Sequence, residues 1–378
     1  MYKTILSKQN ISFFMFIFIN FIFGIKYLSR TTPYYLLFSL LIVCFYILIW
    51  KSRNYILKFS NYLNKLNFLI LFLFIGGFYF VFKKIPVESI NVDRWSVINS
   101  FWNNFFSHKY VYFAKSCDGN YPGPMPFYFI LALPFYFIGE LGYFSILGII
   151  IFFLMLKHTR IDTKLQSTSL LLVCSSLFYL HEIVCRSNIF LNSTLVLFVL
   201  VIYFNQKKLS FKKLLFTGIM IGLSISTRNV LVIPFIIAFV FELKTKHINM
   251  KQLLLFGLIS FSTFIVTFLP FVWNYFEDFK KMNPFIIQSS NLMPLNYTLV
   301  CIGLAFVFGY FSKSITDIYF FSGINLFITI LVYFLYHIHN IGFQKTFFES
   351  EADITYFIFC IPFLVFYFLL IENSKTTT

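Results

Sequence analysis

Long apolar runs separated by short polar segments make up most of this chain. A helix needs about 20 apolar residues, with a range near 17–25, to cross a bilayer. Runs of roughly this length recur along the whole sequence and predict about twelve spanning helices. They lie at residues 11–28, 33–50, 67–82, 142–156, 168–184, 188–204, 212–226, 229–242, 252–272, 296–312, 317–336 and 354–371. The pattern therefore predicts an all-α, polytopic membrane protein.

The apolar stretch 125–139 departs from this pattern, because it contains Pro126 and Pro134 and is bounded by glycines. Charge decides its placement, since cytoplasmic loops are rich in Lys and Arg. If the amino terminus is cytoplasmic and 125–139 does not cross, most of the 30 Lys and Arg residues fall inside. A crossing there would put most of them outside. We therefore expect a juxtamembrane or re-entrant helix at 125–139, after a long outer loop at 83–124.

The composition agrees with a membrane protein and excludes a soluble enzyme. Hydrophobic residues make up 59% of the chain and charged residues only 12%, against roughly 25% charged in an average soluble domain. The net charge of +16 is spread between the apolar runs. Such charges are typical of topology determinants, so we expect the lipid bilayer, and no nucleic acid, as a partner.

The two ends of the chain indicate its orientation. Lys3 and Lys8 precede the first apolar run, which favours an uncleaved first span and a cytoplasmic amino terminus. The tail at 372–378 is then cytoplasmic as well. High Phe, Ile, Lys and Asn usage is typical of an A+T-rich bacterium, so we expect the bacterial inner (plasma) membrane. The six cysteines show no spacing that indicates zinc or a disulfide framework.

The same orientation gathers most of the 14 Asp and Glu residues on the outer side. The outer loops, at 83–124, 273–295 and 337–353, are also the long ones. Long polar loops on a scaffold with short connections are where function is expected. In the first of them, Val97, Phe101 and Phe105 recur at helical spacing, which predicts an amphipathic helix at the interface.

This loop carries a resemblance to a known family. Asp93 follows an early span and precedes the interfacial helix. The loop then runs through His108-Lys-Tyr-Val-Tyr112 and a proline-rich return to Ala132-Leu-Pro-Phe-Tyr-Phe-Ile-Gly139. Together these features resemble the GT-C superfamily of integral-membrane glycosyltransferases, which take sugars from polyprenyl-phosphate donors on the non-cytoplasmic face. In that family the acid of this loop is the proposed catalytic base, and the matching residue here is Asp93.

Further segments are similar to mannosyltransferase-like members of that superfamily and follow in the same order. They are the glycine-rich stretch 218–234, Phe268–Phe271 with Asn283–Gln288, and Asp353–Pro362. The resemblance covers roughly residues 67–371, so we divide the chain into an N-terminal two-span segment, 1–66, a core, 67–371, and the tail. Arg94 stands where a second acid would complete a metal-bridging pair, so no metal ligand is assigned, although a divalent cation is possible.

The resemblance implies a sugar donor on polyprenyl phosphate and a glycan or lipid-linked acceptor. A carboxylate takes the proton of the acceptor hydroxyl, and Arg stabilises the leaving phosphate. Asp93 is the expected base. The alternative is that Asp93 is an ordinary solvated acid of the loop, paired to Arg94 or Lys109. The candidate substrate-binding residues are Arg94, Arg186, Arg228, His181, Glu182, Tyr121, Lys280 and Asp353.

Several of these residues can be explained without a role in substrate binding. Arg186 and Arg228 lie near span ends, where an arginine holds phosphate or snorkels to headgroups. His181 and Glu182 are expected to share a helical face with Arg186 and either orient the sugar or form a buried polar cluster. Lys280 stands beside Lys281, and a pair of lysines usually belongs to a solvated surface. Glu351 and Asp353 are further candidates for acceptor or cation binding.

Two other functions stay open from the sequence. A surface-polysaccharide polymerase of the O-antigen type is also multi-span and has large outer loops. A lipid-linked saccharide flippase or other transporter would use polar residues near mid-membrane and internal repeats, neither of which is evident here. The resemblance implies an inverting membrane hexosyltransferase of the cell envelope, and this is our prediction.

Overall fold

The structure is a computed structural model that describes residues 7–56, 62–90, 92–205, 210–245, 249–290, 293–349 and 352–377. Within these ranges the secondary structure is helical, without a strand. The first half comprises α2 (Lys8–Leu28), α3 (Tyr35–Ile56), α4 (Leu63–Lys84), η2 (Val87–Ser89), α5 (Arg94–Phe106), η3 (Val111–Phe113), α6 (Pro126–Ile138), α7 (Gly142–His158), α8 (Thr163–Cys174) and α9 (Leu177–Val184).

The second half continues with α10 (Ile189–Phe204), α11 (Phe211–Ile225), η4 (Asn229–Leu231), α12 (Val232–Thr245), α13 (Met250–Val266), α14 (Leu269–Val272), α15 (Phe276–Lys281) and α16 (Pro284–Ser290). It ends with α17 (Leu295–Phe311), α18 (Ile315–Ile341), η5 (Gln344–Phe348), η6 (Ile354–Cys360) and α19 (Ile361–Thr377). The all-helical prediction is confirmed.

Six of the described helical segments are long and apolar enough to cross a bilayer: Lys8–Leu28, Tyr35–Arg53, Leu63–Lys84, Met250–Val272, Ile315–Ile341 and Ile354–Lys375. A bent pair, α8 with α9, raises this number to seven, and four apolar helices of 10–17 residues come in addition. Large apolar side chains such as Leu48, Phe72 and Leu258 are exposed on these helices, which suits contact with lipid. The chain is thus a multi-pass membrane protein, and the number twelve stays a prediction.

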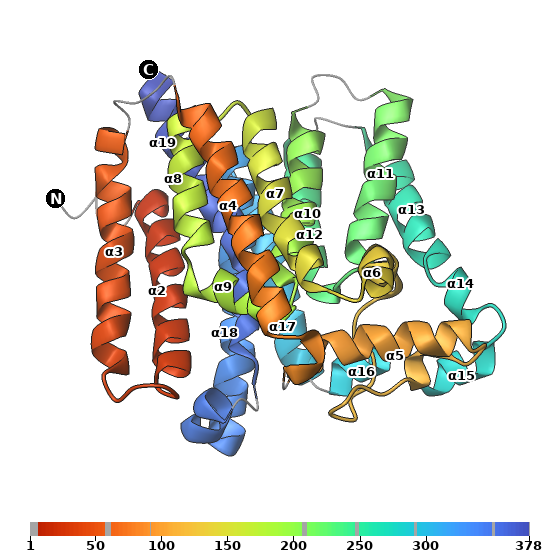
Figure 1. Ribbon diagram of the computed structural model, residues 1–378. Helices are drawn as coiled ribbons and strands as arrows, with labels where there is room; N and C mark the ends of the chain where they lie inside the picture. Colours follow the sequence, from red (N-terminus) through yellow and green to blue (C-terminus); the bar gives the residue numbers. More distant parts are fainter. Residues whose placement is uncertain are drawn as a thin grey trace.

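The helices form a bundle, and α5 lies across one end of it (Figure 1). The short helices α15 and α16 lie at the same end, whereas the carboxyl terminus lies at the opposite end. An aromatic cluster fixes α5 against α6, since the Phe101 and Phe129 rings stack with centroids 3.6 Å apart. Tyr112, also buried, packs edge-on against Phe101. The predicted amphipathic helix is therefore present, and its buried residues Ile98, Phe101 and Trp102 are covered by protein.

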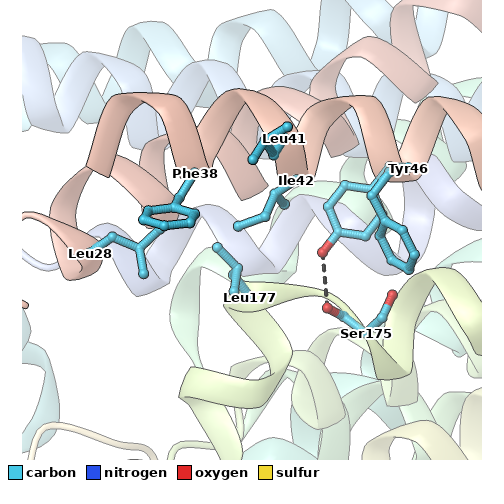
Figure 2. A pocket seen from close by; sticks show the side chains of 8 residues that line it. Leu28, Phe38, Leu41, Ile42, Tyr46, Ser175 and Leu177 are labelled. Atoms are coloured by element: carbon cyan, nitrogen blue, oxygen red, sulfur yellow. Dashed lines mark hydrogen bonds between the residues drawn. The ribbon is translucent and has the colours of Figure 1, made fainter. Parts of the chain in front are cut away.

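The region predicted as one span at 168–184 is broken instead. α8 and α9 meet at a bend of 59°, and Tyr46 donates a hydrogen bond of 2.9 Å to the Ser175 carbonyl at the break (Figure 2). α9 then ends at Val184, and Arg186 adopts the left-handed conformation with φ 55°. A left-handed residue reverses the chain after a helix, so Arg186 does not continue the helical face of His181 and Glu182. The prediction that His181, Glu182 and Arg186 share one helical face is therefore wrong.

Ion pairs join the ends of four helices at the end of the bundle opposite α5. Arg53 of α3 donates to Glu372 of α19 from two nitrogens, at 3.1 and 2.6 Å, and Lys8 of α2 pairs with Asp317 of α18. Gln9 adds a hydrogen bond of 2.9 Å to Glu372. These contacts hold α2 and α3 against the carboxyl-terminal helices.

The helices α11 and α13 approach so closely that only glycine fits between them. A Cβ at Gly222 would lie 2.3 Å from the Ser260 carbonyl oxygen and 2.7 Å from the Thr263 Cβ. Real Cβ atoms do not come so near to backbone, so any side chain would push the two helices apart. The turn that carries Arg228 directly follows α11 and depends on this contact.

We predict that Gly222→Ala destabilises the protein by about 1–3 kcal/mol, because overpacking against backbone strains the helix pair. Thermal unfolding of the detergent-solubilised chain measures the change. Gly257→Ala on α13 is the matched control, since a Cβ there meets nothing within 4 Å. Equal melting temperatures for the two variants would contradict the close contact.

Candidate functional site

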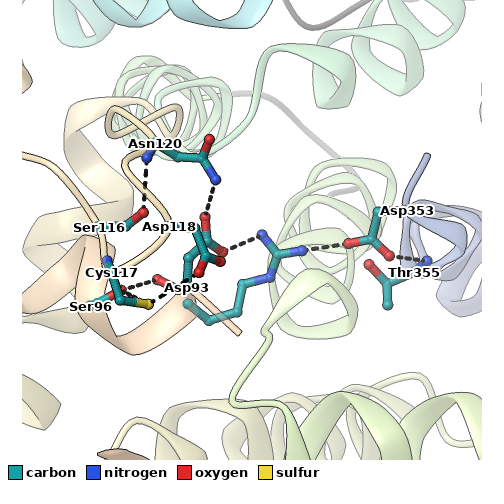
Figure 3. A network of polar contacts seen from close by, with 9 residues as sticks. Asp93, Ser96, Ser116, Cys117, Asp118, Asn120, Asp353 and Thr355 are labelled. Atoms are coloured by element: carbon teal, nitrogen blue, oxygen red, sulfur yellow. Dashed lines mark hydrogen bonds and ion pairs between the residues drawn. The ribbon is translucent and has the colours of Figure 1, made fainter. Parts of the chain in front are cut away.

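Three of the predicted site residues meet at the end of the bundle where α5 lies. Arg94 is the first residue of α5, and its guanidinium lies between the carboxylates of Asp93 and Asp353 (Figure 3). One nitrogen is 3.4 Å from the Asp93 Oδ1, and another donates to the Asp353 Oδ2. Residues about 260 positions apart in sequence thus form one charged cluster, which the sequence did not show.

Asp93 is the N-cap residue of α5, but its carboxylate does not cap the helix. An N-cap Asp ordinarily accepts a hydrogen bond from the second or third backbone N–H of its helix. Here one carboxylate oxygen faces Arg94, and the other accepts a hydrogen bond of 3.0 Å from the Asn120 side chain (Figure 3). The carboxylate is therefore directed away from the helix and into the cluster.

The loop after η3 forms the other wall around Asp93. The Asn120 N–H donates to the Ser116 hydroxyl at 3.1 Å, and the Cys117 N–H donates to the Ser96 hydroxyl at 3.0 Å. Ser96 in turn donates to the Asp93 carbonyl at 3.0 Å. These bonds tie the loop to the first turn of α5, so the position of Asn120 relative to Asp93 is fixed.

Asp353 is the N-cap of η6 and, unlike Asp93, it does cap its helix, accepting from the Thr355 N–H at 2.8 Å. Burial alone raises the pKa of this carboxyl, but the Arg94 charge and the Thr355 hydrogen bonds outweigh burial and hold the pKa below its ordinary value. For Arg94 burial alone lowers the pKa, because it disfavours the charged guanidinium. The negative charge of Asp353 outweighs burial and raises the pKa above its ordinary value. Both groups are therefore ionised at neutral pH.

Arg228 lies on one side of the cluster, next to Tyr128. The guanidinium carbon is 5.2 Å from the centre of the Tyr128 ring, and the Nε of Arg228 is buried without a hydrogen-bond partner. Tyr128 is close enough to Arg94 and Asp93 to interact with their charges. Tyr128 therefore lies between Arg228 and the charged cluster of Asp93, Arg94 and Asp353. The buried Nε–H of Arg228 is a hydrogen-bond donor without a partner, which a ligand can satisfy.

Hydrogen bonds fix the turn that carries Arg228. The Met125 N–H donates to the Thr227 carbonyl, and the Tyr128 N–H donates to the Ser226 carbonyl, each at 3.2 Å. The Ser226 hydroxyl is 2.7 Å from the Thr267 hydroxyl. The proline-rich return after Tyr121 thus packs directly on the turn at 226–228, which explains why both segments reach the same site.

Lys26 and His181 lie within electrostatic range of Asp353. The His181 ring packs on Tyr27, with centroids 3.9 Å apart, and its Nε2 is 3.3 Å from the Cys185 sulfur. Its Nδ1 is buried without a partner. Lys26 was missed by the sequence analysis, although a lysine inside an apolar run is itself a signal of function.

Arg186 does not join the cluster and instead links the segments that carry Glu140, Val184 and Ile85. Its guanidinium forms two hydrogen bonds of 2.9 Å with Glu140, and it donates to the Val184 and Ile85 carbonyls at 2.7 Å. The side chain is 1% exposed. Because these contacts occupy all three guanidinium nitrogens, we expect Arg186 to hold helix ends together and not to bind phosphate.

The other predicted residues are Glu182, Tyr121 and Lys280. The buried Glu182 accepts from the Phe190 N–H at 2.9 Å, at the start of α10. The half-buried Tyr121 ring faces the Lys115 ammonium at 5.4 Å. Lys280 pairs with Glu277 at 2.7 Å on the surface of α15. These contacts of Tyr121 and Lys280 are local, whereas Glu182, like His181, lies within electrostatic range of Arg94 and Asp353.

The described residues contain no group of three or more His, Cys, Asp or Glu side chains arranged to hold a metal ion. Between the carboxylates of Asp93 and Asp353 lies the Arg94 guanidinium. Glu351, a further cation candidate from the sequence, lies outside the described residues. A divalent cation therefore stays a prediction without a ligand set.

Comparisons with known protein families, with curated proteins and with solved structures found no match for this chain. The arrangement offers a directed carboxylate, an arginine with an unsatisfied donor and a second cation at Lys26, all at one end of a membrane bundle. These groups suit chemistry in which a proton is removed and a phosphate is bound.

We predict that Asp353→Asn lowers the stability at pH 7 by about 1.5–3 kcal/mol, the range for a hydrogen bond to a charged group. Asn preserves the volume and the N-cap, so only the charge is lost. Because the folded pKa of Asp353 lies below its unfolded value, the stabilisation is complete well above pH 4 and is lost as the pH falls through the folded pKa.

Unfolding of the wild-type and variant chains between pH 3 and pH 7 tests this expectation, because the difference between them should shrink in acid. Glu277→Gln is the control, since it removes a carboxylate from the exposed pair with Lys280, and exposed pairs contribute little. A difference between wild type and Asp353→Asn that stays constant with pH would contradict the ion pair.

Proposed function

We propose that this protein is an inverting membrane glycosyltransferase. It moves a sugar from a polyprenyl-phosphate donor to a lipid-linked glycan or other envelope acceptor on the non-cytoplasmic face. The observation that carries the proposal is the Asp93 carboxylate, which is turned away from its own helix and held by Asn120 and Arg94. A helix-capping acid would be structural, whereas a carboxylate positioned by other side chains is available for chemistry.

The reaction is a single displacement at the anomeric carbon. The acceptor hydroxyl gives its proton to the Asp93 carboxylate, and its oxygen forms the new bond to that carbon. The bond from the anomeric carbon to the phosphate oxygen breaks, and its electron pair leaves with the polyprenyl phosphate. Attack opposite to the leaving group inverts the configuration. Asp93 later returns its proton to water or to the released phosphate.

Arg228 is the residue that we assign to the donor phosphate. Its buried Nε has no partner, and its guanidinium carbon is 5.2 Å from the centre of the Tyr128 ring. A guanidinium stabilises the negative charge that develops on the leaving phosphate. Arg186 was the other candidate, but its donors are bound to Glu140 and to two carbonyls.

An apolar groove near Arg228 suits the prenyl chain of the donor. It measures about 510 Å³ and is lined by Phe264, Ile265, Phe268, Leu269, Val272, Trp273, Phe276, Phe279 and Phe285. Trp273 is 79% exposed at its edge, so the groove opens toward lipid. Thr267, next to the groove, contacts Ser226 in the turn that carries Arg228. A lipid chain in the groove would thus place its phosphate near that turn.

The orientation belongs to the same proposal. The ends of α2, α3 and α19 that carry Lys8, Arg53 and Lys375 lie opposite α5, and a cytoplasmic location for them agrees with the positive-inside rule. Asp93 then faces outward, and both termini are cytoplasmic. We retain the twelve spans and the bacterial inner membrane as parts of this proposal.

We predict that Asp93→Asn lowers transfer by about 10²–10⁴-fold, the contribution of a general base, while membrane insertion and melting temperature stay near those of the wild type. Transfer is measured with purified protein, polyprenyl-phosphate sugars and membrane extract, as the appearance of a new glycosidic linkage. Asp118→Asn, in an exposed acid of the same loop, is the control and should stay active.

Several outcomes would contradict the proposal. Full transfer by Asp93→Asn would remove its catalytic assignment. Chains of increasing length made by the purified protein would favour the polymerase, and flipping of lipid-linked saccharide without bond formation would favour the transporter.

We also predict that Arg228→Met lowers transfer by about 10²–10³-fold, the range for removal of one donor that stabilises a developing negative charge. Arg228→Lys should recover only part of this activity, because a lysine lacks the planar fork. Single-turnover rates at saturating donor separate this effect from weaker binding. A rate unchanged from the wild type would assign Arg228 to lipid headgroups.

A further inference from the structure

The exposed side chain of Asn120 holds one oxygen of the Asp93 carboxylate. Its amide nitrogen donates a hydrogen bond of 3.0 Å to the Asp93 Oδ2 (Figure 3). An exposed asparagine bonds to water nearly as well, so this hydrogen bond adds little to the stability of the fold. Its consequence is instead a fixed orientation of the Asp93 carboxylate.

A tight turn at residues 116–120 brings this side chain to Asp93, and the turn is closed without it. Gly119 has φ 78°, in the left-handed region that favours glycine, and its N–H donates to the Ser116 carbonyl at 3.0 Å. The Ser116 N–H donates to the Asn120 carbonyl at 2.9 Å, and the Asn120 N–H donates to the Ser116 hydroxyl at 3.1 Å. These bonds use the backbone of Asn120, so its side chain can be replaced while the turn remains.

Arg94 competes with Asn120 for the same carboxylate. One guanidinium nitrogen is 3.4 Å from the Asp93 Oδ1, whereas a close pair of guanidinium and carboxylate has a separation of about 2.7–2.9 Å. A second nitrogen of Arg94 is bound to Asp353, which anchors the guanidinium. Without the hydrogen bond from Asn120, the Asp93 carboxylate is free to turn and to close on this fixed cation. A carboxylate in such a pair is no longer directed at a substrate.

We propose that Asn120 is a positioning residue, which keeps the Asp93 carboxylate out of a closed ion pair with Arg94 and in the orientation that takes the acceptor proton. The inference rests on the proposed function and adds to it a residue that acts through the base. The Asp93 side chain is 16% exposed, so an acceptor hydroxyl can approach it. Each carboxylate oxygen has two lone pairs, and the hydrogen bond from Asn120 leaves one of them for the proton.

The test compares variants of the purified full-length chain in the transfer assay with polyprenyl-phosphate sugars and membrane extract. We expect Asn120→Ala to lower kcat by about 10–10²-fold, the cost of a misplaced catalytic group, with KM nearly unchanged. Asn120→Gln keeps the amide donor and should recover part of the rate. Asn120→Asp has the same size but faces Asp93 with a like charge, so its rate should be no higher than that of Asn120→Ala. Asp118→Ala, in an exposed residue of the same turn, is the matched control and should keep the wild-type rate.

A double variant separates positioning from a structural defect. A residue that acts only through Asp93 has nothing to position once the base is removed. Asn120→Ala combined with Asp93→Asn should therefore transfer no more slowly than Asp93→Asn alone. A general defect of the site would slow the double variant further. The melting temperature of Asn120→Ala should stay near that of the wild type, because the turn is closed by backbone groups.

Three results would overturn the inference. An Asn120→Ala variant with the wild-type kcat, beside an inactive Asp93→Asn, would remove the role of Asn120 and leave the proposed function standing. A raised KM with an unchanged kcat would show that Asn120 contacts the substrate and does not position the base. Full transfer by Asp93→Asn would instead remove the base itself, and with it the proposed mechanism.

Discussion

The ion pairs of Arg94 hold together the segments at the end of the bundle where α5 lies. Asp93 and Arg94 begin α5, whereas Asp353 begins η6 and leads into α19. A guanidinium between two carboxylates joins these segments, and the low local dielectric strengthens the attraction. Because α5 also packs on α6 through Phe101 and Phe129, the same junction positions the proline-rich return and, through it, the turn at Arg228.

The sequence predicted the class of fold well, because the bilayer restricts what can cross it. Only helices and closed barrels satisfy their backbone groups in lipid, so long apolar runs specify helices directly. The break between α8 and α9 was not predictable from hydropathy, since Ser175 and Ser176 interrupt an apolar run only slightly. The bend depends on tertiary contacts, among them the hydrogen bond from Tyr46.

The candidate site was predictable only in part. An acid after an early span pointed to Asp93, and an arginine at a span end pointed to Arg228, but neither feature shows which side chains converge. Arg186 illustrates the limit, because the same sequence signal led to a residue that ties helix ends together through Glu140. Packing between segments far apart in the chain decides which arginine has all its hydrogen-bond donors paired and which has an unpaired one.

The packing of α2 shows how the N-terminal helices relate to the rest of the chain. The resemblance to glycosyltransferases begins only after the second predicted span, so α2 lies outside the segment that carries it. Yet α2 packs against α9, η6 and α19, and Lys26 lies within electrostatic range of Asp353. The ion pairs of Lys8 and Arg53 hold α2 and α3 against α18 and α19. The N-terminal helices are therefore part of the same packed bundle as the segment that carries the resemblance.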